Sequence, residues 1–127
     1  MSVVVPDLKY TKDHEWVKVE GKLAQVGITD HAQAELTEIV FVELPSIGKE
    51  VRVGEVLGNV ESVKTVSEVF APVSGTVKEA NGKLVDSPEL LNKEPYGLGW
   101  VAVIEMSDPG ELASLMSADA YRKLIGE

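Results

Sequence analysis

Valine most strongly constrains the fold of this chain, because it occupies 20 of 127 positions. Its β-branched side chain is stiff at χ1 and suits a pleated sheet better than a helix. The valines fall in short apolar or alternating segments, separated by residues that favour turns. The sequence therefore predicts a mainly β protein built from short strands.

Seven strands are expected in these segments. They are Trp16–Glu20, Leu23–Ile28, Ile39–Leu44, Glu55–Glu61, Thr65–Ala71, Gly75–Ala80 and Gly99–Met106. Gly21 and Lys22 predict a tight connection between the first two strands. Asn81 and Gly82 predict a second tight hairpin, between Val77 and Val85, because both residues tolerate positive φ.

Short helices are predicted from capping signals. Asp30 with Gln33 forms a capping-box pattern, and Ser87-Pro88 and Asp108-Pro109 each place a cap before a proline at the first helical position. Ser117 precedes a terminal helix over 118–125. Apolar residues of the C-terminal segment recur at helical spacing and predict a stripe that docks on the sheet. They are Leu112, Leu115, Met116, Ala120, Tyr121 and Leu124.

Size and charge narrow the classes of function. A chain of 127 residues predicts one domain over residues 1–127. Its net charge of −9 argues against binding to nucleic-acid phosphates or anionic lipids, both of which need basic patches. No apolar run has the length of a membrane span, and the first six residues lack a signal-peptide pattern. We expect a protein that binds neither nucleic acid nor membrane.

Cysteine is absent, which excludes disulfides, thiolate metal sites and thiol nucleophiles. The two histidines, His14 and His31, lie 17 positions apart and do not share one helix face as an i, i+4 pair would. Packing or capping is therefore favoured over zinc binding or general-base catalysis. Any redox chemistry would need a cofactor.

One turn departs from the usual turn chemistry. A reversal is needed between the strands Glu55–Glu61 and Thr65–Ala71, yet Ser62-Val63-Lys64 contains no Gly, Asn, Asp or Pro. Lys64 lies midway between Gly54 and Gly75, as the tip of a hairpin would. An exposed apolar and cationic tip has no evident folding purpose, which indicates a functional residue.

Two roles are open to a lysine at such a tip, besides that of an ordinary surface charge. Schiff-base catalysis requires a desolvated amine or a neighbouring cation, whereas the nearest ionisable residues are Glu61 and Glu68. Acylation by another enzyme requires only prominence and access. The second role is favoured, and Lys64 is then the mount for a prosthetic arm.

The stretch GNVESVKTVSEVFAPVSGTV resembles the lipoyl-lysine hairpin of the biotinyl/lipoyl carrier superfamily. Its ESVKTVSEV core closely resembles the H-protein family of the glycine cleavage system. Further similar stretches are LKYTKDHEWV, VGITDHAQAELTEIVFVELP and NGKLVDSPELLNKEPYGLGW, followed by a helical tail. Together they cover almost the whole chain.

The resemblance implies a barrel-sandwich hybrid of two small antiparallel sheets with short flanking helices, one of them C-terminal. It also implies lipoate attached covalently to Lys64 by a lipoate or octanoate transferase or ligase, with Glu61, Ser62, Val63 and Thr65 as the recognition surface. The protein would then be a monomeric carrier without catalytic residues of its own. We expect it in the bacterial cytoplasm, or in the mitochondrial matrix if it is a processed eukaryotic form.

Three partner enzymes follow from the same resemblance. A glycine decarboxylase (P protein) would load the aminomethyl group, an aminomethyltransferase (T protein) would pass it to tetrahydrofolate, and a dihydrolipoamide dehydrogenase (L protein) would reoxidise the arm. The loaded arm is expected in a surface groove that includes Glu15, whose carboxylate would pair with the ammonium of the cargo. Ile28, Thr29 and Asp30 are further groove candidates. Some relatives carry histidine where Glu35 stands, so the contact of that histidine is not transferred to this chain.

Four other classes of protein are alternative interpretations of the sequence. A biotin carrier would flank its lysine with methionines, whereas Val63 and Thr65 stand there. A lipoyl domain of a 2-oxo acid dehydrogenase would be shorter and joined to Ala/Pro linkers, which this chain lacks. A relay that donates lipoate to other proteins remains open as an alternative or added role. An enzyme is disfavoured because no cluster of nucleophile, base and orienting group is evident.

Overall fold

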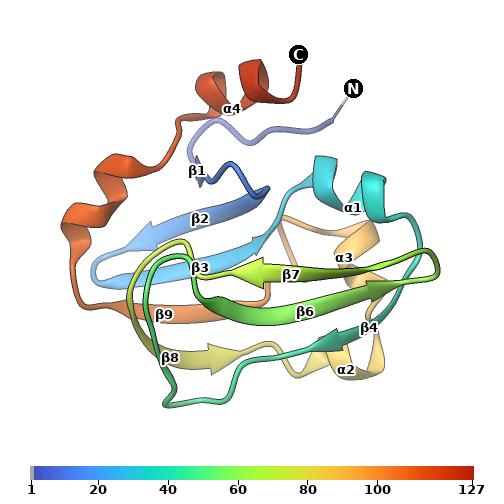
Figure 1. Ribbon diagram of the computed structural model, residues 1–127, viewed down its shortest axis with the longest axis horizontal. Helices are drawn as coiled ribbons and strands as arrows, with labels where there is room; N and C mark the ends of the chain where they lie inside the picture. Colours follow the sequence, from blue (N-terminus) through green and yellow to red (C-terminus); the bar gives the residue numbers. More distant parts are fainter. Residues whose placement is uncertain (1) are drawn as a thin grey trace.

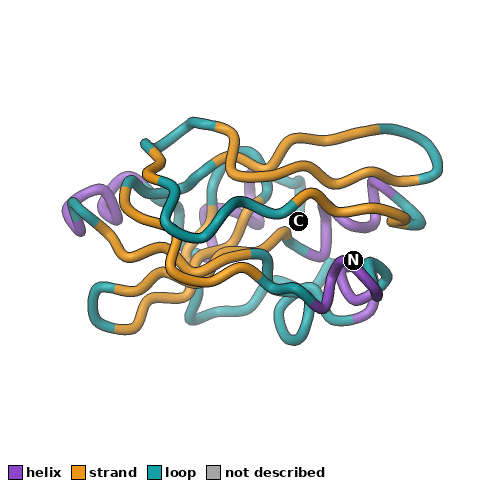
Figure 2. Tube along the Cα trace, turned by 90° about the horizontal axis from the view of Figure 1, so that it is seen from below, coloured by secondary structure: helices purple, strands orange, loops and turns teal. Residues whose placement is uncertain are grey.

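The computed structural model describes residues 2–127 and places two antiparallel sheets face to face (Figures 1 and 2). The larger sheet has the order β1-β2-β3-β9-β8-β5, and the smaller has the order β4-β6-β7. The larger contains β1 (Lys9–Tyr10), β2 (Glu15–Glu20), β3 (Leu23–Ile28), β5 (Glu50–Val51), β8 (Gly75–Ala80) and β9 (Ala102–Met106). The smaller contains β4 (Ile39–Glu43), β6 (Val56–Ser62) and β7 (Val66–Phe70). The mainly β, two-sheet prediction is confirmed.

Short helices flank the sheets. They are α1 (Asp30–Leu36), α2 (Lys83–Asp86), α3 (Leu90–Lys93), a 3₁₀ helix (Pro109–Ser114) and α4 (Ala118–Leu124). None of the helices within residues 2–127 is long and apolar enough to cross a membrane. Figure 1 shows α4 lying beside the N-terminal segment, on the side of the larger sheet.

The core is mostly valine, leucine and isoleucine from the inner faces of the two sheets, including the fully buried Val26, Val77 and Ile104. A second, aromatic cluster lies where the chain ends meet. There Tyr10 stacks on Tyr121 with ring centroids 4.6 Å apart, and Trp16 donates its indole N–H to the Pro95 carbonyl over 2.8 Å. The valine-rich pattern thus forms the sheets, and the aromatic residues fasten the termini to them.

The predicted strands are found with small shifts, except at the start of the last one. Gly99–Val101 lie outside β9, because the Gly99 amide donates to the Glu94 carbonyl and closes the end of α3. A Cβ at Gly99 would lie 2.6 Å from the Leu90 carbonyl oxygen, so only glycine fits there. The glycine belongs to a helix end rather than to a strand.

The hairpin predicted at Asn81-Gly82 is wrong. β8 pairs with β9 instead, and α2 begins directly after Gly82. The Asn81 side chain is buried and donates to the carbonyls of Leu98 and Trp100, over 2.7 and 2.8 Å. Long-range hydrogen bonds therefore use the residue that local turn statistics assign to a hairpin.

Two helix starts differ from the prediction. Thr29, not Asp30, caps α1, and its hydroxyl accepts from the Ala32 amide; Asp30 is the first helical residue and accepts from the Gln33 side chain. The cap predicted at Ser87-Pro88 is also wrong, because α3 begins at Leu90 without a side-chain cap. A threonine directly before an aspartate offers two capping oxygens, and the chain uses the first.

The C-terminal capping signals are confirmed. Asp108 caps the helix that opens with Pro109, which is a 3₁₀ helix, and Ser117 caps α4. Within the predicted stripe, Leu112, Leu115, Met116 and Tyr121 pack inward. Ala120 and Leu124 are exposed, so that part of the stripe is wrong; Ala118 fills the buried position in α4.

Candidate functional site

Lys64 lies at the closed end of the β6–β7 hairpin. Figures 1 and 2 show this end reaching past the rest of the molecule, beside α1. Val63, Lys64 and Thr65 are all exposed, and Val63 keeps 65% of its surface accessible. The reversal predicted between the two strands is confirmed, with Lys64 at its tip.

A single hydroxyl organises this turn. Ser62 is buried, and its Oγ accepts from the amides of Lys64 and Thr65 at 3.2 and 3.1 Å. The same hydroxyl lies 3.2 Å from the Thr65 carbonyl, to which the Ser62 amide also donates over 2.8 Å. Serine side chains can close turns in this way. The turn is therefore closed by ordinary serine turn chemistry, and the prediction that Ser62-Val63-Lys64 departs from such chemistry is wrong.

Two further contacts fix the tip to the body. The Val63 amide donates to the Glu38 carbonyl over 3.0 Å, and the Lys64 Nζ donates to the Glu35 carbonyl over 2.9 Å. Both acceptors belong to α1 or the residues just after it. The backbone of the tip is thus held at several points, while the amine is held by one carbonyl on the surface.

An exposed row of side chains crosses the smaller sheet next to the tip. Glu61 of β6 pairs with Phe41 of β4 on one side and with Val66 of β7 on the other. Phe41 and Val66 keep 55% and 61% of their surface accessible. An apolar row around one carboxylate, close to a prominent lysine, is a surface suited to recognition by another protein.

Glu15 is buried at the junction of the two sheets, with 1% of its surface accessible. It begins β2, and one carboxylate oxygen accepts from the Thr11 hydroxyl over 2.6 Å. The other oxygen accepts from the Phe70 amide of β7 over 3.1 Å. The carboxylate therefore links the larger sheet to the smaller one.

Burial raises the pKa of Glu15 to about 7, although the hydrogen bonds from Thr11 and Phe70 act in the opposite direction. Desolvation disfavours the charged form of a carboxyl group. A cation placed beside Glu15 would favour that charged form. The group is therefore poised to change its ionisation when a positive ligand arrives.

A surface cavity of about 410 Å³ opens over Glu15. Much of its lining is apolar, with Tyr10, Phe70, Pro72, Leu115 and Met116 among the residues. The charged residues Lys12, Asp13 and Glu111 line it as well as Glu15. A larger hollow of about 720 Å³ near β5 is lined by charged residues, including Glu50, Arg52 and Asp108, and contains neither Glu15 nor Lys64. The smaller cavity better suits an apolar ligand that carries one positive group.

Lys64 and the cavity lie at opposite ends of β7. Phe70, which lines the cavity, follows Lys64 by roughly 20 Å of strand at about 3.3 Å per residue. A lysine side chain alone does not cover that span. A longer arm on Nζ, folded back along the hairpin, would be needed to connect them.

The other groove candidates do not line the cavity. Ile28 is buried in β3 and is the register partner of Glu15. Thr29 is fully buried, and its hydroxyl lies 2.7 Å from the Tyr121 hydroxyl. Asp30 accepts from the Val3 amide over 2.8 Å. Thr29 and Asp30 thus connect α1 to α4 and to the N-terminal segment, whereas Ile28 belongs to the core.

The histidines, separated in sequence, meet in space. The ring centroids of His14 and His31 are 4.8 Å apart, and His31 Nε2 lies 3.0 Å from a Glu35 carboxylate oxygen. Burial, followed by the neighbouring His31, lowers the pKa of His14. Sequence spacing missed this cluster because the fold, not one helix face, brings His14 to the other two.

Comparisons with known proteins agree over nearly the whole chain. The family described as Glycine cleavage H-protein matches residues 8–127. A glycine cleavage system H protein of Coprothermobacter proteolyticus is 58% identical over 125 residues, and one of Staphylococcus haemolyticus is 55% identical over 124; each match covers 98% of both chains. The crystal structure of a glycine cleavage system H protein from Mycobacterium marinum superposes with a TM-score of 0.90 at 39% identity, covering 98% of this chain and 100% of that chain.

Replacing Ser62 by alanine should loosen the tip. Ser62→Ala removes the acceptor of the Lys64 and Thr65 amides, and we expect a loss of about 1–2 kcal/mol and faster hydrogen exchange at both amides. Ser67→Ala, a matched change in β7, should leave those amides protected. Equal exchange in the two variants would show that the hydroxyl does not organise the turn.

The raised pKa of Glu15 predicts a pH-dependent stability. Between the ordinary value of 4.5 and about 7 the folded protein binds more protons at Glu15 than the unfolded chain does, so its contribution to the unfolding free energy falls as pH rises. Relative to wild type, Glu15→Gln should therefore gain about 1–3 kcal/mol from pH 5 to pH 8 in urea unfolding. Glu20→Gln, at an exposed site, should show no such trend. If the difference in unfolding free energy between Glu15→Gln and wild type does not change with pH, the raised pKa of Glu15 is contradicted.

Proposed function

Because the chain belongs to the glycine cleavage H-protein family, we propose that Lys64 is the residue that carries its lipoyl group. The protein is a lipoyl carrier of the glycine cleavage system. The observation that carries the assignment of the lysine is its place at the exposed tip of the β6–β7 hairpin. An acylating enzyme must reach the amine without unfolding the sheet, and a tip permits this.

The surroundings of Lys64 fit a lipoyl mount. Ser62 fixes the backbone on both sides of the lysine, and the amine donates to one surface carbonyl, that of Glu35. Amide formation at Nζ would remove its positive charge and add one unit to the net negative charge of the protein. The backbone of the hairpin does not depend on that charge, so modification should leave the fold unchanged.

We propose that a lipoate or octanoate transferase or ligase recognises the tip through Glu61, Val63 and Thr65, which are exposed, with Ser62 setting their positions. The neighbouring Phe41 and Val66 extend this surface. Side chains on a rigid sheet present the same pattern in every molecule, which favours selective acylation of one lysine.

Lipoate on Lys64 would supply a disulfide that accepts an aminomethyl group together with two electrons. We propose that the chain's own contribution is to bind and shield that cargo in the cavity over Glu15. The Glu15 carboxylate would pair with the ammonium group, and the apolar walls would exclude water from it. The raised pKa of Glu15 supports this role, because a cationic ligand would favour loss of the Glu15 proton and so strengthen the ion pair between carboxylate and ammonium.

Ile28, Thr29 and Asp30 would support this groove from behind. Ile28 stands opposite Glu15 in the sheet, and Thr29 and Asp30 open the helix that faces His14. We propose that they position the wall of the groove while Glu15 contacts the cargo.

The proposed partners follow from the cargo. A glycine decarboxylase would load the arm, an aminomethyltransferase would transfer its one-carbon unit to tetrahydrofolate and release ammonia, and a dihydrolipoamide dehydrogenase would reoxidise it.

The protein itself would act as a monomeric carrier without catalytic residues, formed by residues 1–127 as one domain. Its net charge of −9 favours docking on basic surfaces with salt-sensitive association. Its relatives in bacteria are consistent with a cytoplasmic location.

The alternatives are not favoured by the similar proteins reported above. Those relatives are glycine cleavage system H proteins, matched over almost their full length. A lipoyl domain of a 2-oxo acid dehydrogenase would match only part of a longer chain. A role in donating lipoate to other proteins has no separate feature of the described residues in its favour.

The attachment site is tested by intact mass spectrometry. Protein from lipoate-replete cells should carry one lipoyl increment, and Lys64→Arg should carry none because arginine offers no acylable amine. Lys78→Arg, a matched change at an exposed position on β8, should keep the increment. A lipoyl increment that persists in Lys64→Arg would place the arm on another lysine.

A further inference from the structure

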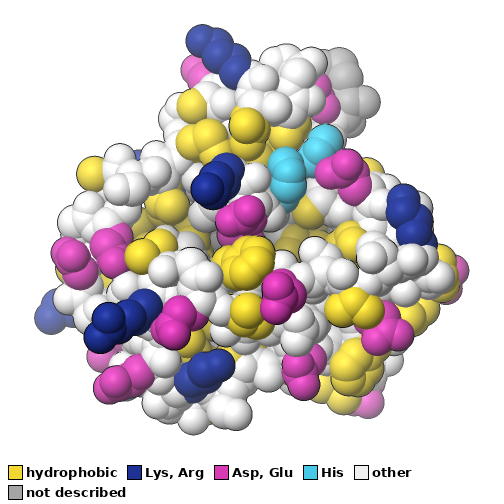
Figure 3. Space-filling view, in the orientation of Figure 1, with side chains coloured by type: hydrophobic (Ala, Val, Ile, Leu, Met, Phe, Trp, Pro, Cys, Tyr) yellow, Lys and Arg dark blue, Asp and Glu magenta, His cyan; other side chains and the backbone are white. Residues whose placement is uncertain are grey.

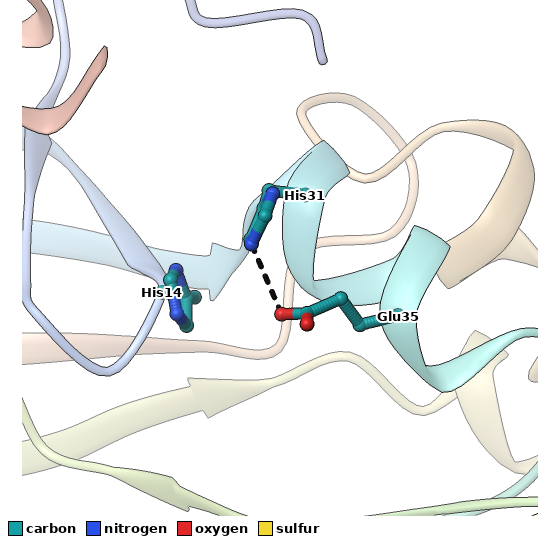
Figure 4. Close-up of side chains that lie close together, drawn as sticks. All are labelled: His14, His31 and Glu35. Atoms are coloured by element: carbon teal, nitrogen blue, oxygen red, sulfur yellow. Dashed lines mark ion pairs between the residues drawn. The ribbon is translucent and has the colours of Figure 1, made fainter. Parts of the chain in front are cut away.

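His14, His31 and Glu35 form a cluster that has no role in the carrier function proposed above. His31 and Glu35 lie one turn apart on the same face of α1, and His14 approaches them from the loop before β2 (Figure 4). In Figure 3 the two histidine side chains reach the surface at one place, next to an acidic side chain. The cluster is therefore accessible from solvent.

We propose that these three residues bind one divalent transition-metal ion of the Zn²⁺ type. Two imidazoles and one carboxylate are a ligand set that Zn²⁺ takes in proteins, with the fourth position left to water or an external ligand. Soft thiolate ligands are not needed for such a site. The fold thus brings together a ligand set against which the sequence, with distant histidines and no cysteine, argues.

The distances are close to those of a metal centre. One ligand atom from each residue lies within 4.8 Å of the other two, and His31 Nε2 is already 3.0 Å from a Glu35 oxygen. Around a tetrahedral ion with bonds of about 2.0–2.1 Å, neighbouring ligand atoms lie about 3.3 Å apart. Bringing the three ligand atoms to that spacing therefore requires a shift of at most about 1.5 Å. The Glu35 side chain is 65% exposed and free to supply much of that movement.

A hydrogen-bond chain holds the third ligand in place. His14 Nδ1 lies 2.8 Å from the Tyr121 hydroxyl, which in turn lies 2.7 Å from the Thr29 hydroxyl. Thr29 caps α1, the helix that carries His31 and Glu35. Metal-binding histidines commonly have their second ring nitrogen held in this way, which fixes the tautomer and the ring plane. When His14 Nδ1 donates its proton to the Tyr121 oxygen, Nε2 is unprotonated and is the nitrogen left for the ion.

The backbone at His14 agrees with a fixed ligand. His14 has φ of +68°, a left-handed conformation that few residues other than glycine adopt. The hydrogen bonds of its amide to the Thr11 carbonyl and of its carbonyl to the Thr29 amide secure this conformation. The ring is thus directed toward α1 by the fold itself and not by a mobile loop.

The Lys64 amine donates to the carbonyl of Glu35, so the test uses protein with unmodified Lys64, in which this contact is present. Zn²⁺ binding is measured by isothermal titration calorimetry, and Co²⁺ is added as a spectroscopic probe of coordination. We expect one ion per chain, a visible Co²⁺ absorption typical of a four-coordinate site, and a rise in Tm with Zn²⁺. Glu35→Gln and His31→Ala should each weaken binding by about tenfold or more.

The control is Glu38→Gln, which makes the same change of charge at an exposed position just after α1 and should keep wild-type affinity. Circular dichroism confirms folding, and if His31→Ala fails to fold, Glu35→Gln carries the test, because its side chain is on the surface. Wild-type binding no tighter than that of Glu35→Gln, or a stoichiometry other than one, overturns the proposal. The cluster would then be a His–Glu ion pair alone, and the assignment of Lys64 would be unaffected.

Discussion

The buried carboxylate of Glu15 is the contact on which the arrangement of the site depends. It joins β2 of the larger sheet to β7 of the smaller one through the Phe70 amide, and it lines a surface cavity. Burying a carboxylate costs free energy unless it is hydrogen-bonded, and here two donors do not fully offset that cost, so its pKa lies near 7. A cationic ligand would relieve the same cost, which links the stability of the junction to the cargo proposed for it.

The hairpin provides the other half of the site, because it combines a fixed backbone with an exposed lysine side chain. Its backbone is fixed by Ser62 and by the carbonyl of Glu38, whereas the exposed Lys64 amine is held by one carbonyl, that of Glu35. About 20 Å of strand separates the lysine from the cavity. A carrier needs both features, since a mobile mount would lose its recognition surface and a short side chain would not reach its binding pocket.

Most of the strands could be predicted from the sequence because valine alternation and local turns are short-range signals. The errors fall where long-range contacts decide. Asn81 bonds to the carbonyls of Leu98 and Trp100 and so leaves the predicted hairpin, and Gly99 serves the end of α3. Lys64 could be identified from its place in the turn between two strands, although the turn itself is an ordinary one closed by Ser62. The meeting of His14 with His31 could not, because no local pattern records that the fold brings β2 to α1.

The lifetime of the aminomethyl cargo on the lipoylated protein tests the role of Glu15 most directly. After loading with glycine and glycine decarboxylase, intact mass should show the arm plus the aminomethyl increment, and the rate at which that increment disappears can be followed after the enzyme is removed. Glu15→Gln should lose the cargo faster than wild type while remaining fully lipoylated, and Glu20→Gln should match wild type. An unchanged lifetime in Glu15→Gln would contradict the claim that the buried carboxylate holds the cargo.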